Sequence, residues 1–160
     1  MTRVQRVREL FATPEAVYGT VVFAAIVAAS SDEEDLDILQ VLVFSVISIV
    51  VFWGAHVYAT TIARHGKDGL GATIAAAVRH SWPMLTAVVL PSIPLVLGVA
   101  GLIAPDDAVD DSLSVAMGVL GVLGFLSFWE RGRPLILCFL GGLGAASFGL
   151  LVIVINAAVH

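Results

Sequence analysis

The feature that most constrains the fold of this chain is an almost unbroken apolar segment from Ile38 to Ala63. As an α-helix with a rise of about 1.5 Å per residue, its 26 residues would extend about 39 Å, enough to cross a hydrocarbon core of about 30 Å. Lipid offers no hydrogen bonds, so a segment that crosses it must satisfy its own backbone groups, as an α-helix does. The segment therefore predicts a membrane-spanning helix.

The composition supports a chain that has lipid as its solvent. Hydrophobic residues make up 59% of the 160 residues and charged residues 13%, whereas soluble domains average about 45–50% and about 25%. We expect a single membrane domain comprising residues 1–160. Cys138 is the only cysteine, which excludes a disulfide framework and a cysteine-rich metal site.

Four further apolar segments predict four more spans. Thr13-Pro14-Glu15 is typical of a helix start, with a Thr cap, Pro at the first helical position and an acid in the first turn. A basic lead before an apolar run that ends in Ala28-Ala29-Ser30 is also the pattern of a signal peptide, but we expect this run to be retained as the first span. The predicted fold class is an all-α integral membrane bundle of five transmembrane helices, with spans at about residues 14–30, 38–63, 83–104, 112–129 and 134–158.

A less apolar segment separates the second and third spans. Leu70, Ile74 and Val78 recur there at intervals of four residues. That spacing is typical of an amphipathic helix lying along the membrane surface. We expect a short interfacial helix at about residues 68–80.

The distribution of basic residues predicts the orientation. All eight Lys and Arg residues fall in the lead, in the segment after the second span and in the turn after the fourth. Trp82 and Trp129 fall at the same predicted boundaries, where amphipathic rings are enriched. By the positive-inside rule, the N-terminus is cytoplasmic and the C-terminus lies outside, in what we expect to be a bacterial cytoplasmic membrane.

Small residues mark faces of the last two spans. In lipid, such residues let helices approach closely and gain packing contacts. These faces predict a close contact between the two spans or an interface of a homo-oligomer; they contain Gly118, Gly121, Gly124, Gly141, Ala145 and Gly149.

Two prolines interrupt the third span. Pro91 and Pro94 leave the carbonyls of Ala87 and Leu90 without helical partners, which predicts a kink. Freed carbonyls can coordinate a cation in transporters with broken helices. The alternative is a plain kink that a Thr86 or Ser92 hydroxyl relieves.

His56 is the candidate functional residue of the second span. An ionisable side chain inside a span is costly, and imidazole can carry a proton or ligate a metal. Glu15 is expected at a similar depth, so the two could form a cation or proton site with Tyr18 and Tyr58 as orienting residues. The alternatives are a hydrogen-bonded structural histidine, an acid that serves the helix dipole, and tyrosines that anchor the interface.

Two acidic turns lie on the predicted outer side. They could concentrate cations at an external mouth or simply keep the turns solvated. No phosphate-binding loop, nucleophile–base pair or zinc-hydrolase helix is present, so we do not expect an enzyme; whether the chain binds a cofactor stays unknown. The few basic residues make nucleic acid a poor partner.

Two short motifs resemble a known family. Glu15-Ala16-Val17-Tyr18-Gly19 and Leu90-Pro91-Ser92-Ile93-Pro94 are similar to the first and third spans of the vacuolar iron transporter family. The resemblance implies five spans, a cytoplasmic N-terminus and transport of a metal cation. That family's first-span acid would fall near Val22, and its second-span Glu and Met are replaced around Ala55 to Tyr58.

A second resemblance involves the centre of the chain. Phe52-Trp53-Gly54-Ala55-His56 is similar to the aromatic-His segment of prokaryotic relatives of the endolysosomal potassium channel. The five-span plan also resembles that of small bacterial membrane proteins. The leading hypothesis is a multi-pass transporter of a small cation or metal ion; a cation channel and a non-transporting membrane subunit or scaffold are the alternatives.

Overall fold

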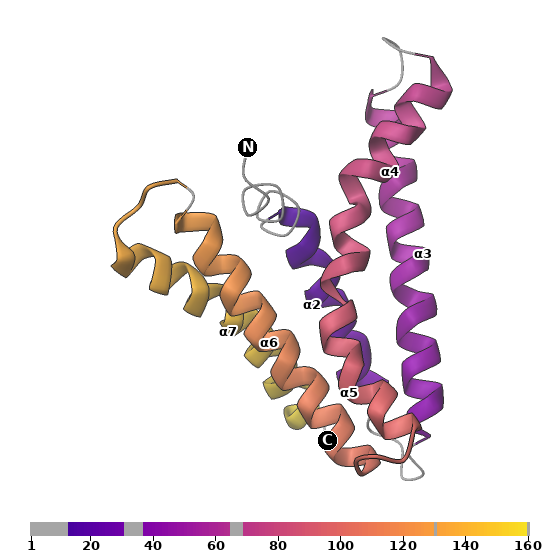
Figure 1. Ribbon diagram of the computed structural model, residues 1–160, viewed down its shortest axis with the longest axis vertical. Helices are drawn as coiled ribbons and strands as arrows, with labels where there is room; N and C mark the ends of the chain where they lie inside the picture. Colours follow the sequence, from indigo (N-terminus) through magenta and orange to yellow (C-terminus); the bar gives the residue numbers. More distant parts are fainter. Residues whose placement is uncertain (1–12, 31–36, 65–68, 130, 160) are drawn as a thin grey trace.

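The computed structural model describes residues 13–30, 37–64, 69–129 and 131–159. This part of the chain is entirely helical and contains no strand, which confirms the all-α prediction. The basic lead, most of the first acidic turn and residues 65–68 lie outside the described residues. The helices are α2 (Pro14–Ser30), α3 (Ile38–Arg64), α4 (Leu70–Ala87), α5 (Val89–Val99), α6 (Pro105–Trp129) and α7 (Leu135–Val159) (Figure 1).

The helices form two groups that diverge toward one end of the molecule. α3 and α4 run side by side as a long antiparallel pair with α2 beside them, and α6 packs along α7 (Figure 1). At the other end, α5 leads into α6 and the two groups meet. The first turn of α2 therefore lies at the end where the groups are far apart.

The core lies where α2 meets the α3, α4, α5 and α6 helices. Its largest fully buried side chains include Phe23, Met84, Leu95 and Leu120. The outward faces are also apolar: Val51 of α3 is 65% exposed and Ile136 of α7 is 70% exposed. Soluble monomers rarely expose contiguous apolar surface on this scale, so these faces suit contact with lipid.

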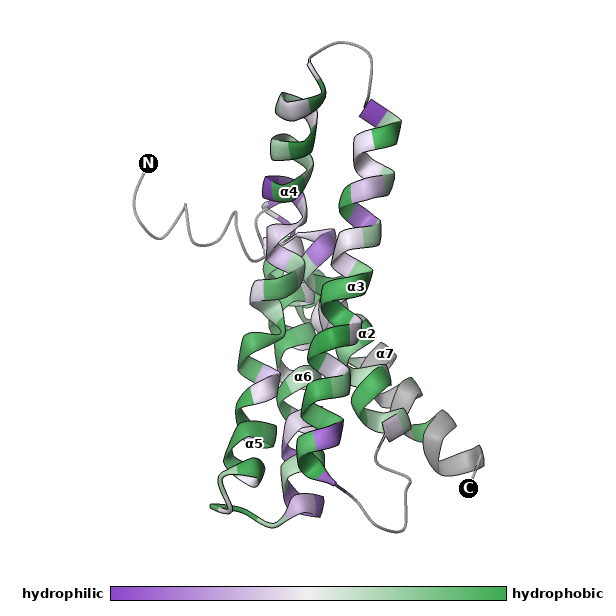
Figure 2. Cartoon of the chain, turned by 90° about the vertical axis from the view of Figure 1, so that its right-hand side faces the viewer, coloured by the Kyte–Doolittle hydropathy of each residue, from purple (hydrophilic) through white to green (hydrophobic). Residues whose placement is uncertain are grey.

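Some of the predicted spans correspond to helices that are long and apolar enough to cross a membrane. α3, with 27 residues, and α6, with 25, are each long and apolar enough to cross a bilayer. α4 and α5 together form a third candidate, bent by 47° at their junction. The described helices thus contain two or three candidate spans, and Figure 2 shows how far hydrophobic residues cover them.

The region before the third predicted span differs from expectation. Instead of an interfacial helix at residues 68–80 and a separate span from residue 83, α4 continues from Leu70 through Pro83 to Ala87. Proline inside a helix removes one hydrogen bond and costs about 3 kcal/mol. Pro83 and Met84 are both buried, and their packing holds the helix together across that gap. The chain bends later, at Val88.

After the bend, a hydrogen bond joins α5 to α6. Ser112 of α6 donates a buried hydrogen bond of 2.7 Å from its Oγ to the carbonyl oxygen of Pro91. The hydroxyls expected to relieve the kink bind other carbonyls: Thr86 donates to Pro83 and Ser92 donates to Val89. The proline segment is therefore held by a neighbouring helix.

Acidic residues start two of the helices. The Oδ1 atom of Asp37 accepts a hydrogen bond of 3.0 Å from the Leu39 amide and so caps α3. α6 begins at Pro105, seven residues before the predicted span, and takes in the second acidic turn. Acids in a first helical turn are stabilised by the helix dipole, which explains why Asp106 and Asp107 belong to the helix.

Three small residues of the predicted faces, Gly124, Gly141 and Ala145, lie at a close contact between α6 and α7, as one of the two sequence interpretations expects. A Cβ atom built on Gly124 would be only 2.7 Å from the Cβ of Ala145, and one built on Gly142 would be 2.8 Å from the carbonyl oxygen of Gly121. Gly118 lies in open space instead. Glycine is thus required at Gly124 and Gly142 for the two backbones to approach.

Candidate functional site

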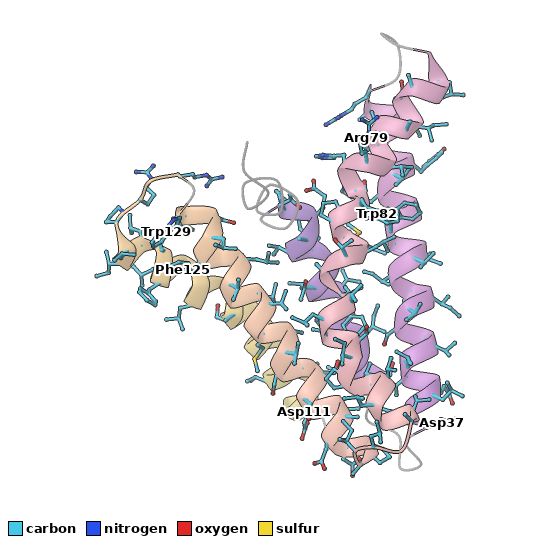
Figure 3. The ribbon with its side chains drawn as sticks, viewed as in Figure 1. Asp37, Arg79, Trp82, Asp111, Phe125 and Trp129 are labelled. Carbon is cyan, nitrogen blue, oxygen red and sulfur yellow. The ribbon has the colours of Figure 1, made fainter. Side chains whose placement is uncertain are left out.

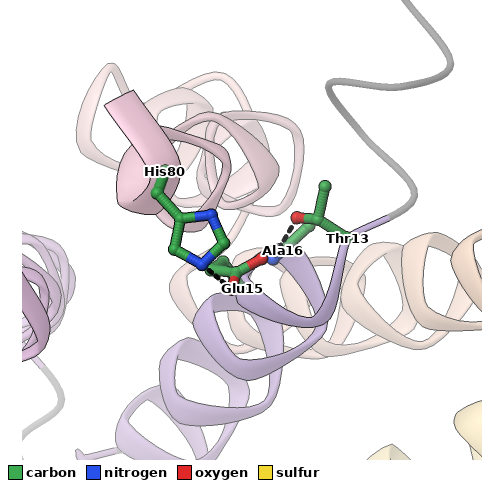
Figure 4. A network of polar contacts seen from close by, with 4 residues as sticks. All are labelled: Thr13, Glu15, Ala16 and His80. Carbon is green, nitrogen blue, oxygen red and sulfur yellow. Dashed lines mark hydrogen bonds and ion pairs between the residues drawn. The ribbon is translucent and has the colours of Figure 1, made fainter. Parts of the chain in front are cut away.

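The most distinctive polar contact in the described part of the chain joins α2 and α4. The Nε2 atom of His80 lies 3.0 Å from the Oε1 atom of Glu15 (Figure 4). The Glu15 side chain is 9% exposed, whereas that of His80 is 44% exposed. A buried carboxylate is thus in contact with an imidazole that also reaches the surface.

The start of α2 sets the position of the carboxylate. The amide of Ala16 donates to the Thr13 Oγ1 atom at 3.3 Å, which caps the helix, and Glu15 follows in the first turn (Figure 4). One turn later, Gly19 packs directly against the Met84 backbone of α4. This close approach brings the first turn of α2 within reach of His80.

The contact gives the buried Glu15 carboxylate a partner. Burying an unpaired carboxylate is costly, so a partner that donates a hydrogen bond or carries a positive charge is needed. Histidine side chains as a class gain or lose a proton near neutral pH and can fill either role. The pair therefore has the chemistry of a proton-binding or cation-binding group.

The four residues grouped by the sequence are not joined to one another by hydrogen bonds or ion pairs in the described structure. Glu15 contacts His80, and His56 is half-buried on α3 with no such partner among the described residues. Tyr18 and Tyr58 are 58% and 69% exposed, respectively. A role of His56 in binding a cation stays a prediction.

The described residues contain no group of three or more His, Cys, Asp and Glu side chains that could hold a metal ion. Glu15 and His80 supply two ligands at most. Protein sites for transition metals normally use three or four side chains, so this pair alone resembles a proton site more closely than a resident metal centre.

Sequence reasoning missed His80 because it assigned this residue to the end of an interfacial helix. One signal could have found it: His80 lies two residues before Trp82, which is expected at the same cytoplasmic boundary as the start of the first span. Because α4 continues through Pro83, His80 lies on the same helix as Met84, which packs against α2, and it can contact Glu15.

Two of the grooves formed by the described residues lie on the outer surface of the helices. One of about 630 Å³ separates the upper part of α3 from α4 and is lined by residues that include Val57, Tyr58 and Ile74. The other, of about 530 Å³, lies between α6 and α7 and includes Gly118, Phe125 and Phe139 among its lining residues. Neither groove contains Glu15 or His80 in its lining.

Charged residues are segregated along the long axis. Asp37 and Asp111 lie at one end of the molecule, and Arg79 lies toward the other end, as does Trp129 (Figure 3). The Glu15–His80 pair belongs to the end that carries Arg79.

The chain matches no protein-family model, and comparison with curated proteins and with solved structures gives no significant match.

Proposed function

We propose that this chain is an integral membrane protein of five spans that transports a small cation or metal ion, with Glu15 and His80 as the pair that binds it. The N-terminus would be cytoplasmic and the C-terminus outside, in a bacterial cytoplasmic membrane. The separation of Asp37 and Asp111 from Arg79 along the molecule supports this orientation.

The observation that carries the proposal is the burial of Glu15 against His80. Ionisable side chains inside membrane helices are rare and expensive, and they typically mark ion paths or proton relays. Here the carboxylate is 9% exposed while the imidazole is 44% exposed, so the imidazole can exchange protons or ions with the surface and pass them to the carboxylate.

The test is flux through proteoliposomes with the full-length chain, followed with dyes for protons and for divalent metals. Glu15→Gln and His80→Gln should each lower flux by about tenfold or more. A tenfold loss of flux corresponds to about 1.4 kcal/mol. Breaking a fully buried ion pair lowers stability by about 3–5 kcal/mol, and we expect a smaller effect here because His80 is partly exposed.

His56→Gln is the matched control, since it removes an imidazole from α3 without touching the pair. It should leave flux within about twofold of wild type, a difference of about 0.4 kcal/mol. Loss of flux in His56→Gln with normal flux in His80→Gln would instead favour the site expected from the sequence. Wild-type flux equal to that of protein-free vesicles would refute transport by either site.

A non-transporting membrane subunit or scaffold is the second candidate. It is favoured by the outer face of α6 and α7, where a Cβ atom added at Gly118 would meet nothing within 4 Å and Gly118 lines an apolar groove. Small residues on a lipid-facing surface suit close approach of another helix, from a second copy or a partner. Light scattering in detergent would decide between a monomer and an oligomer or a complex of fixed stoichiometry.

A further inference from the structure

Two buried polar groups of α3 and α4 have no hydrogen-bond partner in the described part of the chain. They are the indole Nε1 of Trp53 on α3 and the hydroxyl of Ser81 on α4. The Ser81 residue is fully buried. Leaving a buried donor unpaired costs about 1–3 kcal/mol, so such groups normally have a partner, often an internal water.

The register of the helices places both groups at the level of the pair. Tyr58 and Ile74 line one groove between α3 and α4, as do Ile62 and Leu70. The two helices run antiparallel, so the residue five positions before Tyr58 is level with the residue five positions after Ile74. Trp53 is therefore level with residues 79–81, to within about 3 Å along the axis.

The third helix, α2, joins at the same level. Glu15 contacts His80, and Gly19 packs against Met84, so the two helices keep a constant offset in register. Ser81 directly follows His80 in the chain. Three helices therefore bring a carboxylate, an imidazole, a hydroxyl and an indole N–H to similar depths along the bundle.

The hydrogen bonds that Trp53, Ser81 and Glu15 can make restrict what could bind between them. The indole N–H of Trp53 can only donate a hydrogen bond, and the hydroxyl of Ser81 can donate or accept one. The carboxylate of Glu15 accepts. A guest that receives a hydrogen bond from the indole and donates one to the carboxylate must have both a lone pair and a proton. Water meets this requirement, whereas a bare metal cation cannot accept a hydrogen bond.

Building on the proposed function, we infer that the transported cation is the proton, and that Trp53 and Ser81 hold the water molecule through which it reaches Glu15. As an incoming proton binds this water, the water passes one of its own protons to the carboxylate; a carboxyl group and a neutral water remain. Release is the same step in reverse, with no change in oxidation state. His80 positions the carboxylate and connects it to the surface.

The first test compares cargo ions in proteoliposomes. Wild-type protein should carry protons down a pH gradient, with no flux of Mn²⁺ or K⁺ above that of protein-free vesicles. Trp53→Phe keeps an aromatic ring but lacks the N–H, and Ser81→Ala lacks the hydroxyl; each should lower proton flux by about tenfold, the effect of one lost hydrogen bond of about 1.4 kcal/mol. Trp82→Phe, at a residue that is 50% exposed, is the matched control and should carry protons as wild type does.

The second test detects the water without transport. The chain has three tryptophans, so the double variant Trp82→Phe, Trp129→Phe leaves Trp53 alone. Ultraviolet resonance Raman spectra of that variant should show a hydrogen-bonded indole N–H that exchanges in deuterated water, and adding Ser81→Ala should weaken the bond.

The outcomes separate this inference from the proposed function. Transport of Mn²⁺ or K⁺ without proton flux would overturn the inference and leave cation transport standing. An indole N–H free of hydrogen bonds would also overturn it, even where protons are carried. Absence of all flux would overturn both.

Discussion

The contact between Gly19 and Met84 offers a test of how α2 and α4 hold the Glu15–His80 pair. A Cβ atom added at Gly19 would fall 2.9 Å from the Met84 Cγ atom and closer still to the backbone of Met84. A side chain can move aside at little cost, but the backbone of a packed helix cannot. Gly19→Ala must therefore push the two helices apart.

The magnitude follows from two opposing effects. Alanine is favoured over glycine inside a helix by about 0.5–1 kcal/mol. Overpacking a tight contact costs about 1–3 kcal/mol. Because the added Cβ atom meets backbone, the upper part of that cost applies, about 2–3 kcal/mol, and the net effect is a loss of about 1–2 kcal/mol. The distance between Glu15 and His80, which lie one turn away, should also lengthen.

Gly54→Ala is the matched control. Gly54 lies inside α3 with nothing within 4 Å of an added Cβ atom. There the helix preference acts alone, so we expect a gain of about 0.5–1 kcal/mol. Thermal unfolding in detergent should lower the midpoint for Gly19→Ala and raise it for Gly54→Ala. A Gly19→Ala protein as stable as wild type would refute the close contact.

Two further substitutions test buried hydroxyls. Ser45 is fully buried on α3, one turn from the buried Val41 and Ile49, and its Oγ has no partner in the described structure. Apolar neighbours on its own face do not hold a water, in contrast to the polar groups near Ser81, so Ser45→Ala should raise the free energy of unfolding by about 1 kcal/mol; a decrease would indicate a bound partner. Ser112→Ala removes the 2.7 Å hydrogen bond to Pro91 and should lower stability by about 1 kcal/mol in the same unfolding assay, and no change would show that this bond contributes nothing.

Much of the helical framework could be predicted from local signals. The apolar segment from Ile38 to Ala63 forms α3, Ile38–Arg64. Both the apolar run and the Asp37 cap at its start can be read from neighbouring residues in the sequence. The predicted first span has the same limits as α2, since the Thr13 cap fixes its start.

The errors arose where packing outweighs local preference. Pro83 is a reasonable start for a helix by its own chemistry, yet burial beside Met84 keeps it inside α4. The same misjudgement hid His80, because a residue assigned to a separate surface helix could not be expected to contact Glu15. Glu15 was identified from the sequence. Its partner was not, because the sequence does not give the register of α2 against α4, which brings His80 rather than His56 to Glu15.

The bend at Val88 lies between two anchors of different kinds. On one side α4 is fastened to α2 through Gly19 and the Glu15–His80 pair, and on the other side α5 is fastened to α6 through Ser112. Any change in the 47° angle would therefore shift the Ser112 hydrogen bond with respect to the Glu15–His80 pair. Val88 thus lies between the helix that carries His80, α4, and the helix that is hydrogen-bonded to α6, α5.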